Sequence, residues 1–70
     1  MSYNEISSMM ANAFQKQGFE LDDVSEAWLP AELFAEFKRE TQAMGFSLSW
    51  WGIPVKSQNN IGSITFVKTV

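Results

Sequence analysis

The carboxylates are the side chains of this sequence most able to do chemistry, because the 70-residue chain contains neither cysteine nor histidine. That absence removes thiolate metal sites, cysteine nucleophiles and the commonest general base. Asp22, Asp23 and Glu26 form the densest acidic cluster, and such groups can act as an acid–base pair or bind a hard cation. However, the cluster lacks the ligand spacing of a calcium loop, and an aspartate can equally cap a short helical turn.

Motifs for nucleophilic catalysis and phosphate binding are also missing. The eight serines have no histidine to activate them, and none lies in a Gly-x-Ser-x-Gly turn. The four glycines are too scattered to form a loop that cradles phosphate. We therefore expect no enzyme activity, no cofactor and no bound metal.

The distribution of charge is more informative than its sum. The net charge of −3 argues against direct binding to nucleic acid. Residues 20–40 hold seven of the eight acids and only two bases. Glu32, Glu36 and Glu40 recur every four residues, so on a helix they share one side. This stripe is either a solvated helix face or a docking surface for a basic partner.

Two adjacent tryptophans form the other unusual feature. Successive residues of a strand point to opposite faces of the sheet, so Trp50 and Trp51 should differ in burial. If Phe46 and Leu48 face the core together with Trp50, Trp51 projects outward. Exposed tryptophans are typical anchors of protein interfaces. The alternative is that Trp51 covers the outer face of its own hairpin.

The N-terminal third predicts an amphipathic helix from about Tyr3 to Gln17. Ser2 and Glu5 have the spacing of a capping box, and Gly18 can end the helix in the left-handed conformation. Residues 20–30 are expected to connect this helix to the next, with one short helical turn carrying Val24, Ala27 and Trp28.

A second helix is predicted from Pro30 to about Met44, with Gly45 at its end. Residues 46–51 then alternate like a half-buried strand, and residues 61–70 read as the return strand of a hairpin. Val55 should lie in an edge or turn region, because the proline before it, Pro54, cannot donate to a ladder.

The expected fold is therefore a single α+β domain spanning residues 1–70, with two N-terminal helices packed on a C-terminal antiparallel hairpin or small sheet. The hairpin needs that packing, since an isolated hairpin is barely stable in water. The expected core consists of Ile6, Met10, Phe14, Leu33, Phe34, Phe37, Leu48, Trp50 and Phe66.

Taken together, these features favour a small acidic protein-binding module in the cytoplasm, since neither a signal peptide nor an apolar run of membrane-spanning length is present. We expect this module to be an inhibitor encoded by a virus or a mobile element, such as an anti-CRISPR or anti-restriction protein, that occupies a basic, nucleic-acid-handling surface of a host protein. The expected partner-binding residues are Asp22, Asp23, Glu26, Glu32, Glu36, Glu40 and Trp51.

A structural role is the alternative hypothesis. The return strand would leave an exposed edge guarded only by Lys68, and such an edge is a template for pairing with another chain. On this hypothesis the chain is a homodimer or a small subunit that assembles through the edge of its hairpin.

Overall fold

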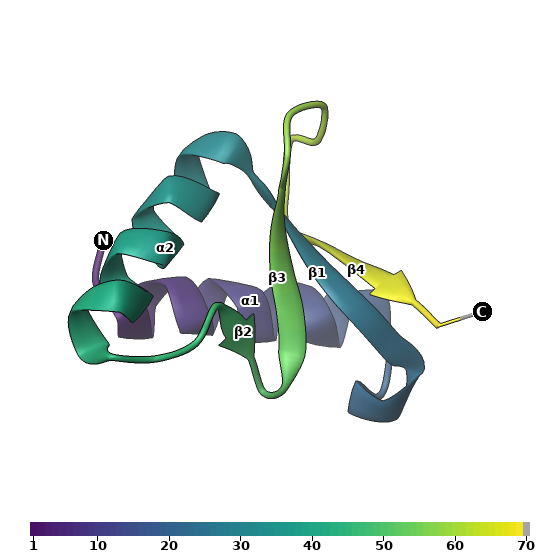
Figure 1. Ribbon diagram of the computed structural model, residues 1–70. Helices are drawn as coiled ribbons and strands as arrows, with labels where there is room; N and C mark the ends of the chain where they lie inside the picture. The colour runs from purple at the N-terminus through teal and green to yellow at the C-terminus, as the bar shows by residue number, and fades with distance from the viewer. Residues whose placement is uncertain (70) are drawn as a thin grey trace.

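The computed structural model describes residues 1–69 and contains a four-stranded mixed sheet, two α-helices and a 3-10 turn (Figure 1). In chain order, the elements are α1 (Tyr3–Gln17), η1 (Leu21–Asp23), β1 (Val24–Pro30), α2 (Ala31–Met44), β2 (Ser49–Trp50), β3 (Ile53–Gln58) and β4 (Thr65–Lys68). The strand order is β2-β3-β1-β4, with β1 parallel to β3 and the other pairs antiparallel. The α+β class is confirmed, but the arrangement is not a helix pair followed by a hairpin.

Helix α1 begins and ends where the sequence predicts, and α2 ends where it predicts. At the start of α1, Ser2 Oγ accepts the Glu5 N–H and Glu5 Oε1 accepts the Ser2 N–H, each at 3.2 Å. Gly18 and Gly45 end α1 and α2 in the left-handed conformation, both at φ 73°. Pro30 is the N-cap of α2 rather than its first residue. These local signals suffice because each cap satisfies backbone groups within a few residues of itself.

The prediction of a connecting segment at residues 20–30 is wrong, because β1 occupies most of it and lies at the centre of the sheet. Val24 and Ala27 are both buried, a spacing that looks helical in the sequence. The structure places both inside because the register with β4 shifts between Val24 and Glu26, as at a β-bulge. Helix α2 is therefore the crossover that parallel pairing of β1 with β3 requires.

The predicted hairpin of residues 46–51 and 61–70 does not form. Instead, β2 pairs with β3, and β4 pairs with β1. Phe46 and Leu48, expected in the core, are exposed because the strand begins only at Ser49. Part of the predicted return strand, Val70, lies outside the described residues.

Val55 lies inside β3, an interior strand of the sheet, rather than in an edge or turn region. Pro54 lies in the same strand. It pairs with Ser49 of β2, whereas pairing with β1 begins one residue later, at Val55. The missing N–H therefore falls before the parallel ladder starts, where a proline is tolerated.

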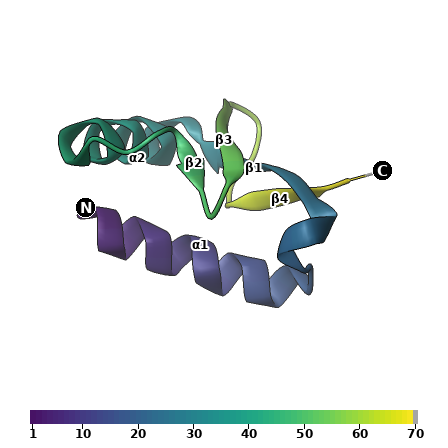
Figure 2. The same ribbon diagram turned by 60° about the horizontal axis from the view of Figure 1, so that its bottom comes forward.

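The core lies on one face of the sheet, and Figure 2 shows α1 running beneath the strands. Phe37 of α2 is fully buried in it, and Phe14, Leu33 and Phe34 are half-buried against it. The opposite face carries polar and apolar side chains, among them Glu26, Trp28, Lys56 and Val67. The buried apolar residues are Ile6, Met10, Val24, Ala27, Leu29, Phe37, Trp50, Ile53, Val55, Ile64 and Phe66.

The free edge of β4 is engaged by a side chain from α1. Gln17 Nε2 donates to the Ile64 carbonyl and Gln17 Oε1 accepts the Phe66 N–H, both at 3.0 Å. One side-chain amide thus makes the two hydrogen bonds that a neighbouring strand would make. Gln17 therefore blocks pairing of another strand with this part of the edge, in addition to Lys68, and the sequence did not predict this role.

Candidate functional site

Trp51 occupies a backbone conformation that favours glycine or asparagine. Trp51 and Gly52 form the two-residue turn between β2 and β3, with φ angles of 52° and 79°. Positive φ at both positions is the requirement of a type I′ turn, in which Asn-Gly is strongly preferred. Holding a bulky side chain in the left-handed region costs on the order of 1–3 kcal/mol. The fold therefore carries local strain at this tryptophan.

The indole of Trp51 is also the most exposed large apolar group in the described chain, at 75% of its surface, whereas Trp50 is only 4% exposed. The two rings meet edge to face with centroids 6.4 Å apart. Trp50 is fixed by contacts with Phe14 and Phe66 and by its Nε1–H, which donates to Ser7 Oγ at 3.0 Å. The predicted difference in burial is confirmed, but Trp51 projects because it lies in the turn, not because it alternates along a strand.

A shallow apolar hollow of about 190 Å³ lies beside the Trp51 ring. Within the described chain, no charged side chain lines it, and Leu21 at its border is 45% exposed. We call this surface the Trp51 patch. It consists of Ala11, Phe14, Gln15, Leu21, Trp50 and Trp51.

Leu21, a member of the Trp51 patch, is the first residue of η1 and is followed in the chain by Asp22 and Asp23. In Figure 1, η1 (the blue turn before β1) and the β2–β3 turn lie at the same end of the molecule. Asp22 and Asp23 are exposed members of η1, and neither forms an ion pair within residues 1–69. They do not cap the turn, since its N-cap is Glu20 and no side-chain cap bond is present.

Backbone hydrogen bonds hold η1 in place. The Asp23 N–H donates to the Glu20 carbonyl at 3.0 Å, and the Asp23 carbonyl accepts the Thr69 N–H at 2.6 Å. The acidic side chains are thus presented from a fixed turn. Leu21 of this turn belongs to the Trp51 patch, so we take the patch and η1 together as the candidate surface, with η1 as its acidic border.

The predicted acidic stripe on α2 is partly neutralised. Glu36 Oε1 lies 3.2 Å from the amino group of Met1 and 3.9 Å from Arg39 Nη2. Glu40 Oε2 lies 3.8 Å from Arg39 Nε. Glu32 alone among the three makes no ion pair within the described residues. The stripe consequently presents less free negative charge than its spacing suggests.

Glu26 is engaged on the outer face of the sheet and lies apart from the other predicted residues. Its carboxylate accepts hydrogen bonds from Lys56 Nζ and, at 2.9 Å, from Trp28 Nε1. These two bonds, chiefly that from Lys56, lower the pKa of Glu26 below the ordinary value of a glutamate. This arrangement ties β1 to β3 across the sheet.

The structure therefore separates the seven predicted partner-binding residues. Trp51 shares a hollow with Leu21, the residue before Asp22 and Asp23, whereas the others lie on α2 or in β1. Sequence reasoning missed Leu21 and Phe14. An isolated leucine within an acidic run was the available signal for Leu21, whereas Phe14 looked like an ordinary core residue.

Neither a metal centre nor a membrane-spanning element is found in the described part of the chain. Across residues 1–69, no three carboxylates gather closely enough to hold an ion. None of the helices there has the length and apolar character needed to cross a bilayer. Comparison of the chain with protein-family models, curated proteins and solved structures finds no match.

Proposed function

We propose that this protein is a protein-binding module that docks on a basic surface of its partner through the Trp51 patch and the acidic turn η1. The observation that carries the proposal is Trp51 itself, an indole that is 75% exposed and held in a strained backbone conformation. Strained residues of this kind cluster at functional sites and persist where the surrounding structure holds them in place.

The stability of the free protein gives little reason to retain this tryptophan. Glycine or asparagine would suit the turn better, and three quarters of the Trp51 surface is exposed, with an edge contact to Trp50 as its aromatic pairing. In a complex, by contrast, a buried tryptophan is among the side chains whose truncation weakens binding most, often by about 2 kcal/mol or more. The hollow beside the ring supplies room for an apolar side chain of the partner.

The charges on the border determine the kind of partner. Asp22 and Asp23 are exposed and unpaired within the described residues, and the chain carries a net charge of −3. Complementary potentials speed association and exclude partners of like charge. We therefore propose a basic partner, of the kind whose surface handles nucleic acid. Inhibition of that partner, as by anti-CRISPR or anti-restriction proteins, is the form of this function that we favour.

The test is affinity capture with the wild-type protein and with Trp51→Asn as a matched variant. Asparagine suits a type I′ turn, so the fold is retained while the indole is lost. The wild type should capture a protein with a basic surface, and Trp51→Asn should bind that purified protein at least about 30-fold more weakly. Equal affinity of the two proteins for the captured partner would refute the proposal.

The salt dependence of the same binding reaction tests the acidic border. Asp22→Asn combined with Asp23→Asn should slow association and flatten its dependence on ionic strength. Glu32→Gln combined with Glu36→Gln makes the same change of charge on α2 and is the control. If the α2 variant has the larger effect, the docking surface is the helix stripe and not η1.

Assembly through the sheet edge has less support. The hydrogen bonds of Gln17 engage the Ile64 carbonyl and the Phe66 N–H, which a second chain would need for pairing with β4. We therefore favour binding to a different protein over self-assembly at this strand.

A further inference from the structure

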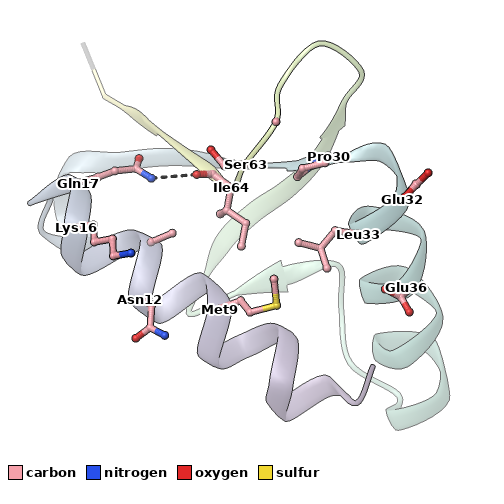
Figure 3. A pocket seen from close by; sticks show the side chains of 12 residues that line it. Met9, Asn12, Lys16, Gln17, Pro30, Glu32, Leu33, Glu36, Ser63 and Ile64 are labelled. Atoms are coloured by element: carbon pink, nitrogen blue, oxygen red, sulfur yellow. Dashed lines mark hydrogen bonds between the residues drawn. The ribbon is translucent and has the colours of Figure 1, made fainter.

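Two concave surfaces differ in what their linings can recognise. A groove of about 700 Å³ lies between α1 and α2, and Figure 3 shows Lys16 on its α1 wall and Glu32 and Glu36 on its α2 wall. Because opposite charges line this groove, its charge does not select one kind of occupant. The hollow of the Trp51 patch has no charged lining side chain within the described residues, and aromatic rings form much of its wall. The hollow is therefore the more selective surface.

Three aromatic rings line the hollow. Those of Phe14 and Trp50 are 6.0 Å apart and inclined at 59°, and those of Trp50 and Trp51 are 6.4 Å apart and inclined at 81°. An edge-to-face contact occupies at most one face of a ring, so at least one face of the Trp51 indole is free of Trp50. That face is open to a ligand, since Trp51 is 75% exposed. The face of an indole attracts cations more strongly than that of any other aromatic side chain.

The chain on either side of Leu21 is acidic. Glu20, Asp22 and Asp23 flank this residue, which itself lines the hollow. None of the three carboxylates forms an ion pair within residues 1–69. The strand register places one base, Lys68, opposite the first residue of β1, directly after η1. Three carboxylates against one ammonium leave this segment negative, so its charge favours a cation.

The size of the hollow suits one side chain. Its volume of about 190 Å³ is below the 300–1,000 Å³ typical of sites for whole small molecules. Arginine combines an apolar methylene stem with a planar guanidinium that stacks on aromatic rings and is more weakly hydrated than the ammonium of lysine. We propose that the hollow binds an arginine side chain, with the methylenes against Phe14 and Leu21 and the guanidinium on the free face of Trp51. This inference rests on the docking function proposed above, which makes the arginine a residue of the basic partner.

The test is a titration of ¹⁵N-labelled protein with arginine, lysine and citrulline, each blocked as the N-acetyl methylamide, at pH 7 and constant ionic strength. Citrulline has the shape of arginine without its charge. Blocked arginine should shift the NMR signals of the Trp51 indole N–H and the Leu21 amide. It should bind about two- to fivefold more tightly than citrulline, the effect of one exposed cation–π contact, and more tightly than lysine. The indole N–H of Trp28, on the opposite face of the sheet, is the internal control and should not shift.

Two variants locate the contact. Trp51→Asn retains the turn and should abolish the preference for arginine over citrulline. Asp22→Asn combined with Asp23→Asn should weaken arginine and lysine and leave citrulline unchanged. Glu32→Gln combined with Glu36→Gln makes the same change of charge on α2 and should leave all three unchanged. The arginine site is overturned if citrulline or lysine binds as tightly as arginine, if Trp51→Asn keeps the preference, or if no blocked amino acid shifts the signals of the hollow.

Failure of the arginine site and failure of the docking function give different results. If Trp51→Asn weakens binding of the captured partner but blocked arginine shows no preference over citrulline, the docking function stands and the arginine site is refuted. If blocked arginine binds as expected but Trp51→Asn binds the partner as wild type does, the arginine site stands and the docking function is refuted.

Discussion

Replacement of Trp51 by asparagine and by alanine separates the energy of the strained turn from that of the indole contacts. Both variants delete the ring and its edge contact with Trp50. Only asparagine tolerates the left-handed backbone at φ 52°, because its short polar side chain bonds locally. Any difference in stability between the two variants therefore reports the conformation of the turn.

The expected magnitudes follow from the structure. Loss of an edge-to-face aromatic pair should lower the free energy of unfolding by about 0.5–1.5 kcal/mol. Relief of the strain in the left-handed backbone should raise it by about 1–2 kcal/mol. Trp51→Asn should thus be about as stable as wild type, within about 1 kcal/mol. Trp51→Ala should be less stable than Trp51→Asn by about 1 kcal/mol, because it loses the contact and keeps the strain.

Thermal unfolding followed by circular dichroism measures this difference. For a domain of this size, about 1 kcal/mol corresponds to about 4–8 °C in Tm. Identical melting temperatures for the asparagine and alanine variants would show that the turn is unstrained. Trp51 would then differ from an ordinary turn residue only by its exposure.

Three further predictions concern the fold. Phe37→Ala changes a fully buried side chain and should lower the free energy of unfolding by about 3–5 kcal/mol. Phe46→Ala changes a side chain that is 50% exposed and should lower it by less than about 1.5 kcal/mol. Equal losses of the two variants in chemical denaturation would contradict the assigned core. Gln17→Ala removes two hydrogen bonds and should lower the free energy of unfolding by about 1–3 kcal/mol. It should also promote self-association at the edge of β4, which light scattering detects. A variant that stays monomeric and equally stable would show that Gln17 does not protect this edge. Because the folded-state pKa of Glu26 is lowered, its contribution to stability is complete above the ordinary glutamate pKa of about 4.3 and is lost as the pH falls below that value through the lowered pKa. Glu26→Gln should remove this part of the acid dependence of Tm, and unchanged dependence would assign it to other groups.

Local signals in the sequence predicted the helices, whereas pairing between distant segments escaped prediction. The bounds of α1 follow from Ser2, Glu5 and Gly18, which act within one turn of the helix end. Strand β1 was missed because its bulge places Val24 and Ala27 on the same side, three residues apart, as a helix would. Only its pairing with β3 and β4 makes this segment a strand.

The candidate site was predicted in part for a similar reason. The exposure of Trp51 was predicted. The turn that it forms with Gly52 was not, because a type I′ turn strongly prefers asparagine, aspartate or glycine at its first position. The proximity of Leu21 to Trp51 depends on how η1 and the β2–β3 turn meet beside α1, which no local pattern encodes. The charges of the α2 stripe were predicted, but the contact between Arg39 and Glu40 was not.

The central position of β1 has a consequence for the time course of folding. Ala27 of β1 pairs with Val55 on one side and Phe66 on the other, so both neighbours of the middle strand are synthesised long after it. Such non-local pairing slows folding, because the intervening chain must be ordered before any contact compensates for the loss of entropy. On the ribosome, α1, α2 and the β2–β3 hairpin can form early. The sheet itself can close only after β4 has emerged, and until then the apolar side chains of β1 depend on the helices for cover.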